Sequence, residues 1–150
     1  MHIALFEPDI PQNTAAILRT AVCFGAEVHI VGPAAFDLGD RAVRRAGLDY
    51  AARAAMRRHL TFDAFQNSVG RVVLFTTRAD VPMPHFAFEA GDTLLFGRES
   101  AGVPDHVHDA LAHKVRIPMV ADARSLNLAV SVAIGLSHAM TVTSQWTDLL

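Results

Sequence analysis

The stretch LLFGRESAGVP, residues 94–104, joins an apolar run to a loop with two glycines, an arginine and a glutamate. Glycine lets the backbone approach another group closely and adopts dihedral angles that other residues avoid. The loop is therefore either a tight turn or a place where a ligand contacts the main chain. Gly97 and Gly102 have the spacing of a phosphate-binding P-loop, but Val-Pro follows where that motif requires Lys and then Ser or Thr.

Common catalytic and metal-binding motifs do not occur in the sequence. No G-x-G-x-x-G pattern follows an apolar run, and Ser100 does not lie in a G-x-S-x-G elbow. His106 and His108 are two residues apart without a clear third ligand, and the other histidines are scattered. The sequence therefore predicts no metal site and argues against a dinucleotide-dependent oxidoreductase.

Two other loops have the same character as the first. FTTRADVP (75–82) and IPMVADARSLN (117–127) also follow apolar runs, and both contain small residues and proline. Ligands of parallel sheets bind beyond the carboxyl ends of the strands, where such loops meet. A pocket of this kind contacts its ligand mainly through peptide N–H and C=O groups, which suits an adenine or another nucleoside-like group.

The elements that must position these loops alternate between strands and helices. Continuous apolar runs, typical of parallel strands covered on both faces, lie at 2–6, 27–31, 71–77, 92–97 and 114–119. Helical patterns lie at 14–25, 41–47, 50–60, 62–70, 105–112 and from about 125 to 143. The alternation predicts an α/β fold with a mostly parallel sheet and flanking helices.

Local signals mark where several of these helices begin and end. Asn13 and Thr61 are expected N-caps, Pro104 is expected to start a helix, and Gly25 and Gly47 are expected to end helices. The last helical pattern is apolar nearly all round, so this helix is buried either in the core or in an interface.

Length and composition are those of one domain, residues 1–150, with 51% hydrophobic and 19% charged residues. No segment resembles a signal peptide or approaches the ~20 apolar residues that cross a bilayer, so we expect a cytoplasmic protein without a membrane segment. The single cysteine, Cys23, lies in an apolar pattern and is expected to be a buried thiol.

The net charge of −2 argues against a generally basic nucleic-acid binder, but arginines cluster between residues 40 and 59. The cluster is either a solvated helical face or a set of phosphate contacts. Its members are Arg41, Arg44, Arg45, Arg53, Arg57 and Arg58.

Four segments together carry a resemblance to a known family. EPDIPQNTAAILRTA, RRAGLDY, LLFGRESAGVP and RIPMVADARSLNLAVSVA occur in this order over nearly the whole chain. They resemble the SPOUT-class RNA 2′-O-ribose methyltransferases, and in particular the small single-domain subfamily that acts on nucleotide 34 of tRNA. The resemblance implies a C-terminal deep trefoil knot, which a reading of the strands alone would exclude because knots are nearly absent among folds.

The resemblance also implies a site for S-adenosyl-L-methionine in the knotted loops, with S-adenosyl-L-homocysteine as product. The implied cofactor contacts are Phe75, Thr76, Gly97, Glu99, Ile117, Met119, Ser125 and Leu126. Phe75 and Ile117 are at the same time candidates for the strand core, and Glu99 either bonds to loop amides or RNA or is a solvated turn carboxylate.

For catalysis the resemblance points to Arg19, beside the nucleotide to be methylated. Arginine is effectively always protonated, so we expect Arg19 to orient a phosphate and stabilise charge rather than to act as the base. Asn13 and Asn127 are the next candidates, although Asn13 is also explained as an N-cap. Family members are homodimers whose sites borrow residues from the partner, and the implied substrate is tRNA.

Three departures from the family pattern affect the mouth of the implied pocket. Ala129 stands where serine is usual, Ala101 replaces a common arginine, and Arg98 replaces a common proline. Two alternatives remain open: a ribosomal-RNA 2′-O-methyltransferase, and a non-catalytic RNA-binding module. The sequence does not choose between cytidine and uridine at position 34.

Overall fold

The computed structural model describes residues 1–36 and 50–149, and in this part of the chain six strands form one parallel sheet. Their order across the sheet is β3-β2-β1-β5-β4-β6. The strands are β1 (His2–Phe6), β2 (Glu27–Val31), β3 (Met56–His59), β4 (Val72–Phe75), β5 (Thr93–Phe96) and β6 (His113–Val115). The predicted α/β fold with a mostly parallel sheet is confirmed.

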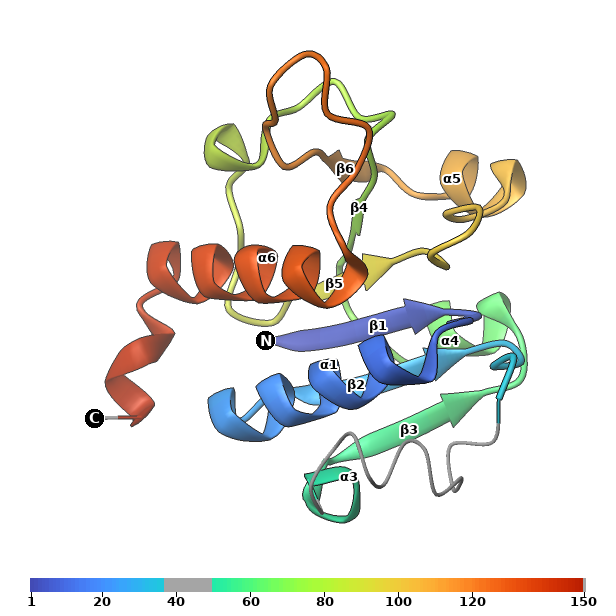
Figure 1. Cartoon of the computed structure of the whole chain (residues 1–150). Coiled ribbons are helices and arrows are strands. Elements are labelled where there is room, and N and C mark those ends of the chain that lie inside the picture. The colour runs from blue at the N-terminus through green and yellow to red at the C-terminus, as the bar shows by residue number, and fades with distance from the viewer. Residues whose placement is uncertain (37–49, 150) are drawn as a thin grey trace.

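Helices cover both faces of this sheet (Figure 1). On one face α1 and α6 lie side by side, and on the other face lie α4 and α5. The helices are α1 (Pro11–Phe24), α3 (Tyr50–Arg53), α4 (Phe62–Gln66), α5 (Asp105–Ala110) and α6 (Leu128–Val142), with 3₁₀ turns at Met83–His85 and Gln145–Leu149. None of the helices in the described part of the chain combines the length and the apolar character needed to span a bilayer.

The core consists of two layers because successive side chains of a strand point to opposite faces. Ile3 and Leu5 belong to the layer beneath α1 and α6, whereas Ala4 and Phe6 belong to the layer beneath α4 and α5. Burial on both faces explains why the central strands are continuous apolar runs in the sequence.

Gly135 lets α6 pack closely on the sheet. A Cβ at this position would lie 2.8 Å from the Cε1 and Cζ atoms of Phe75 and 3.3 Å from the Cζ of Phe96. These two rings stack with their centroids 4.7 Å apart. The close contact fixes the middle of α6 over the carboxyl ends of β4 and β5.

The helix predicted over residues 50–60 is wrong. The helix α3 ends at Arg53, and residues 56–59 form β3, which pairs with β2 at the edge of the sheet. An edge strand needs no continuous apolar run, and Arg57 and Arg58 of β3 are exposed. The helix expected at 41–47, with Gly47 at its end, lies outside the described residues.

Two helix starts also differ from the prediction. The helix α1 begins at Pro11 with Ile10 as N-cap, so Asn13 lies within the first turn and does not cap it. Proline suits this first position because its missing N–H would have no helical partner there. The helix α6 begins at Leu128 rather than near residue 125, and Asn127 is its N-cap.

Three other predicted helix boundaries agree with the structure. Thr61 caps α4, Pro104 precedes α5, and Gly25 ends α1 with a φ of 65°. The helix α4 is shorter than predicted and ends at Gln66. Cys23 is exposed, not buried, because it lies off the stripe of α1 that faces the sheet. The knot implied by the resemblance stays a prediction.

Candidate active site

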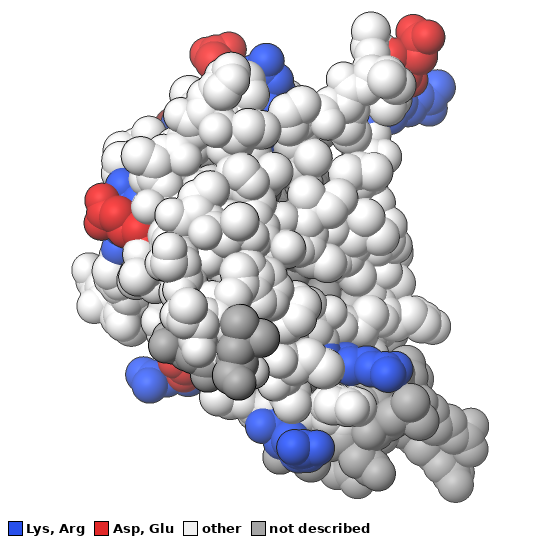
Figure 2. Space-filling model, turned by 90° about the vertical axis from the view of Figure 1, so that its left-hand side faces the viewer, with Lys and Arg blue, Asp and Glu red and all other residues white. Residues whose placement is uncertain are grey.

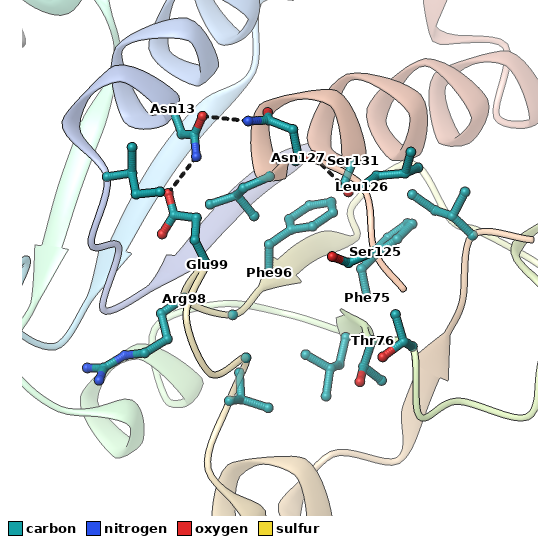
Figure 3. A pocket seen from close by; sticks show the side chains of 18 of the residues that line it. Asn13, Phe75, Thr76, Phe96, Arg98, Glu99, Ser125, Leu126, Asn127 and Ser131 are labelled. Atoms are coloured by element: carbon teal, nitrogen blue, oxygen red, sulfur yellow. Dashed lines mark hydrogen bonds between the residues drawn. The ribbon is translucent and has the colours of Figure 1, made fainter. Parts of the chain in front are cut away.

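A cavity of about 430 Å³ lies at the carboxyl ends of β4 and β5, between the loops that follow β4, β5 and β6 and the start of α6. This volume is typical of small-molecule sites. The structure brings all eight predicted cofactor contacts into its lining, together with Asn13 and Asn127 (Figure 3). The eight are Phe75, Thr76, Gly97, Glu99, Ile117, Met119, Ser125 and Leu126.

Main-chain hydrogen bonds hold two of the three loops together. The N–H of Arg116 donates to the carbonyl of Val81 at 2.9 Å, and the N–H of Met83 donates to the carbonyl of Arg116 at 2.8 Å. The Arg116 guanidinium also donates to the carbonyl of Ala79 at 2.8 Å. These bonds fix the loop after β4 beside the segment that follows β6, and Figure 1 shows both projecting beyond the sheet.

The loop after β5 is a tight turn that also lines the cavity. The N–H of Arg98 donates to the carbonyl of Gly102 at 3.1 Å, and the N–H of Gly102 donates to the carbonyl of Arg98 at 2.8 Å. A Cβ on Gly97 would lie 2.3 Å from the carbonyl carbon of Gly102. Gly97 is therefore required by the close approach of two backbone segments, and Gly102 adopts a left-handed φ of 68°.

A chain of side-chain hydrogen bonds joins three elements at one wall of the cavity (Figure 3). Asn127 Nδ2 donates to Asn13 Oδ1 at 2.9 Å, and Asn13 Nδ2 donates to Glu99 Oε1 at 3.0 Å. Asn127 Oδ1 accepts from the N–H of Ala129 at 2.9 Å and so caps α6. These hydrogen bonds fix α1, the β5 loop and α6 relative to one another.

Glu99 and Asp9 link the β5 loop to the loop before α1. The N–H of Asp9 donates to Glu99 Oε2 at 3.0 Å, and the N–H of Glu99 donates to Asp9 Oδ1 at 3.2 Å. Burial and its hydrogen bonding with Asp9 raise the pKa of Glu99, whereas bonds to Glu99 and Ser100 lower the pKa of Asp9 to about 2. Both Glu99 oxygens accept hydrogen bonds, so Glu99 bonds to a backbone amide as one of the sequence interpretations expected.

Arg19 does not line the cavity. It is exposed on α1, six residues and about 9 Å along the helix axis from Asn13. Its guanidinium carbon lies 5.4 Å from the centre of the Tyr50 ring, and that of Arg53 lies 5.8 Å from the same ring. Within one chain, Arg19 is thus separate from the cavity that holds the other candidates.

The arginine cluster does not form the single helical face that one interpretation expected. Arg57 and Arg58 are successive residues of β3, so their side chains point to opposite faces of the sheet. Arg57 Nε lies 2.5 Å from Glu27 Oε1. Arg41, Arg44 and Arg45 lie outside the described residues.

The cavity is also lined by residues that the sequence did not single out as cofactor contacts: Ile10, Leu74, Thr77, Phe96, Arg98, Gly102, Val103, Leu128 and Ser131. Helical spacing of four residues from the Asn127 cap would have indicated Ser131. Among the departures from the family pattern, Arg98 forms an ion pair with Glu7, and Ala101 is exposed. The hydroxyl of Ser131 donates to the Asn127 carbonyl at 3.1 Å, two residues beyond Ala129.

The fold and the cavity correspond to a known class of protein. The chain belongs to the SpoU rRNA Methylase family, whose sequence model matches residues 1–137. A tRNA (cytidine(34)-2'-O)-methyltransferase of Ancylobacter novellus is 47% identical over 147 residues, which are 95% of this chain and 93% of that protein.

Solved structures agree with this assignment. One, described as "Structural insights into the 2-OH methylation of C/U34 on tRNA", has a TM-score of 0.90 and 38% identity and covers 94% of both chains. An AdoMet-bound rRNA methyltransferase of Sinorhizobium meliloti has a TM-score of 0.84 and 28% identity. The match covers 93% of this chain but only 55% of that longer one.

Proposed function

We propose that this chain is an S-adenosyl-L-methionine-dependent RNA 2′-O-methyltransferase that modifies the ribose of nucleotide 34, cytidine or uridine, in tRNA. The observation that carries the proposal is the cavity formed by the three loops and the hydrogen-bonded series Glu99–Asn13–Asn127. It occurs in a chain that matches a tRNA (cytidine(34)-2'-O)-methyltransferase over nearly the full length of both proteins.

The residues of the cavity fit S-adenosyl-L-methionine. The cavity is large enough for this molecule, and Phe96, Ile117 and Leu126 supply apolar surface. The β5 loop, where the backbones of Gly97 and Gly102 approach closely, presents main-chain groups to the cavity. When bound there, the donor would supply a sulfonium methyl group for transfer to the ribose 2′-oxygen, with S-adenosyl-L-homocysteine as the leaving group and release of the hydroxyl proton. The protein residues hold the donor and orient the ribose, and such positioning contributes ~7–11 kcal/mol in favourable cases.

Arg19 is proposed to serve the cavity of a second subunit. It lies outside the cavity of its own chain, and a guanidinium that stays protonated is suited to holding an RNA phosphate near the ribose. Arg19 therefore orients the substrate and stabilises charge on the 2′-oxygen, and the proton leaves through another group.

A homodimer is proposed from the exposed apolar side chains around α6. Val130 and Ile134 lie one turn apart on this helix and are 46% and 36% exposed. Leu126 and Ile10, which line the cavity, are also exposed. Figure 2 shows a neighbouring face, at the carboxyl ends of α6 and α1, where the described charged side chains lie mainly at the margins. A two-fold arrangement would bury these exposed apolar side chains against the same side chains of a second copy.

Ile134→Glu should halve the molecular mass measured by light scattering and abolish methylation. Leu60→Glu, at an exposed residue elsewhere, should change neither the mass nor the activity.

Transfer of tritium from labelled S-adenosyl-L-methionine tests the proposed activity. Total tRNA from the source cell should acquire label in a 2′-O-methylated cytidine or uridine, mapped to position 34 after nuclease digestion. A transcript with a 2′-deoxy nucleotide at position 34 should acquire none. The Arg19→Lys variant should be strongly impaired because lysine lacks the planar fork. Label at another tRNA position would refute the assigned nucleotide.

Ribosomal RNA is the second candidate substrate, because the family name and the Sinorhizobium meliloti neighbour refer to rRNA. That neighbour is much longer than the part of it that this chain matches. Ribosomal RNA in the same assay decides between the two, and we expect it to stay unlabelled. With tRNA as substrate, the reaction is proposed to take place in the cytoplasm, with contacts to tRNA phosphates from the exposed Arg53 and Arg58.

A further inference from the structure

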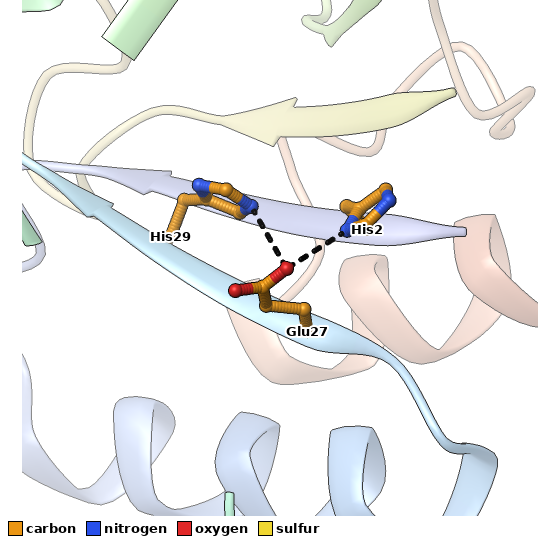
Figure 4. Close-up of side chains that lie close together, drawn as sticks. All are labelled: His2, Glu27 and His29. Carbon is orange, nitrogen blue, oxygen red and sulfur yellow. Dashed lines mark ion pairs between the residues drawn. The ribbon is translucent and has the colours of Figure 1, made fainter. Parts of the chain in front are cut away.

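A second group of side chains lies at the amino ends of the strands, whereas the candidate active site lies at their carboxyl ends. His2 and Glu27 are the first residues of the parallel strands β1 and β2, and His29 follows within β2 (Figure 4). One ligand atom from each of the three lies within 4.8 Å of the other two. A cavity of about 190 Å³ adjoins them.

Two nitrogens of this group are buried without a hydrogen-bond partner among the described residues. They are His2 Nδ1 and His29 Nε2, and the side chain of His29 is only 4% exposed. Glu27 Oε2 lies 3.5 Å from the first and 3.9 Å from the second. Buried polar atoms are nearly always paired, so two orphaned nitrogens that face one carboxylate oxygen indicate a missing ligand.

The surroundings orient two of the three groups. His29 Nδ1 lies 2.9 Å from His59 Nε2, and His59 Nδ1 faces the hydroxyl of Ser68. When His29 carries its proton on Nδ1 and donates to His59, its Nε2 lone pair points into the group. Metal-binding histidines usually donate their second N–H to an outer partner in this way. Arg57 Nε donates to Glu27 Oε1 and leaves Oε2 free.

Burial lowers the pKa of His29 to about 4, and burial also lowers the pKa of His2. Metal ions bind the neutral form of imidazole, which is the main form of a histidine near pH 7 even at its ordinary pKa. The positive charge of Arg57 opposes a nearby cation, but its hydrogen bond to Glu27 holds the carboxylate in place.

We propose that His2 Nδ1, His29 Nε2 and Glu27 Oε2 form a Zn²⁺ site whose fourth position opens to the adjoining cavity. Two imidazoles and one carboxylate are a common ligand set for zinc, with water in the fourth position. Zinc ligands at about 2.0–2.1 Å in tetrahedral geometry lie roughly 3.3 Å apart. The two distances to Glu27 Oε2, 3.5 and 3.9 Å, therefore need to shorten by less than about 1 Å. The distance between the two nitrogens, at most 4.8 Å, needs to shorten by up to about 1.5 Å.

This site departs from the sequence analysis, which predicted no metal. It is also independent of the proposed methyl transfer, because its residues lie at the amino ends of the strands and take no part in the donor cavity. The bound ion would join β1 to β2 directly and to β3 through His59.

Calorimetric titration with ZnCl₂ tests the proposal, using EDTA-treated full-length protein without an N-terminal tag. We expect one Zn²⁺ per chain, with no competition from a tenfold excess of Mg²⁺, which prefers oxygen ligands. His2→Ala and Glu27→Gln should each lower the affinity at least 100-fold. His59→Gln, which removes only an outer partner, should lower it about 10–100-fold. The control His85→Ala, at an exposed histidine elsewhere, should bind as the wild type does.

His2 is the most informative position because its side chain is 39% exposed, so its loss should leave the fold intact. Thermal melts of each metal-free variant check this. Zn²⁺ should raise the Tm of the wild type and of His85→Ala but not of His2→Ala. Equal affinity in the wild type and His2→Ala, or no saturable binding by the wild type, would overturn the proposal.

Discussion

Replacement of Gly97 by alanine tests whether the tight turn after β5 builds the cavity. The added Cβ would lie 2.3 Å from the carbonyl carbon of Gly102 and 2.6 Å from its Cα and from the nitrogen of Val103. Non-bonded carbons prefer a separation of about 3.5–4.0 Å, so the two sides of the turn must part by roughly 1 Å. All three neighbours are main-chain atoms, and no side-chain rotation relieves the contact.

We expect two measurable losses from Gly97→Ala. Overpacking of this kind costs about 1–3 kcal/mol, which urea denaturation would record as a lower free energy of unfolding. Parting the turn also weakens the two hydrogen bonds between Arg98 and Gly102 and displaces one wall of the cavity. Calorimetry with S-adenosyl-L-homocysteine should therefore show an affinity at least tenfold lower, which corresponds to about 1.4 kcal/mol.

Gly91→Ala is the matched control. A Cβ on Gly91 meets no atom within 4 Å, and this glycine has no left-handed φ, so both quantities should stay near their wild-type values. Wild-type stability and affinity in Gly97→Ala would refute the steric reasoning. A loss of stability with unchanged affinity would instead show that the turn stabilises the fold but does not contribute to ligand binding.

Three further predictions concern contacts around the cavity and the sheet. Asn127→Ala should lower the free energy of unfolding by about 1 kcal/mol through loss of the α6 cap, whereas Asn127→Ser should keep the cap. Methylation assays should show both variants impaired, because both lose the bond to Asn13. Gly135→Ala should cost about 1–3 kcal/mol in urea denaturation, because its Cβ would meet the buried Phe75 ring at 2.8 Å and the Phe96 ring at 3.3 Å. Asp92→Ala should cost about 3 kcal/mol or more in the same measurement, since the fully buried carboxylate accepts two bonds from Arg71 at 2.7 and 2.8 Å.

The central part of the sheet could be predicted from the sequence because its strands are buried on both faces. Such strands leave continuous apolar runs, as at residues 2–6 and 92–97. The edge strand β3 could not be found in this way, since its sequence is Met-Arg-Arg-His and two of its residues are exposed. Its pairing with β2 is a tertiary contact that no local pattern records.

The cavity was predictable for a related reason. Loops after parallel strands meet at one edge, so the position of Thr76, Gly97 and Met119 follows from the order of strands and loops. The Asn13–Glu99 bond joins residues 86 positions apart, and neither residue alone indicated it. The same applies to His2 and His29, which looked scattered in the sequence and meet only through the register of β1 and β2.

The exposed thiol of Cys23 makes the proposed assembly directly measurable. Because the chain has one cysteine, a nitroxide spin label would attach at a single point, close to the end of the helix that carries Arg19. Two labelled copies in a symmetric pair would yield one well-defined dipolar distance, and dilution with unlabelled chains would remove it. The same probe would report whether an added anticodon stem-loop draws the two α1 helices together.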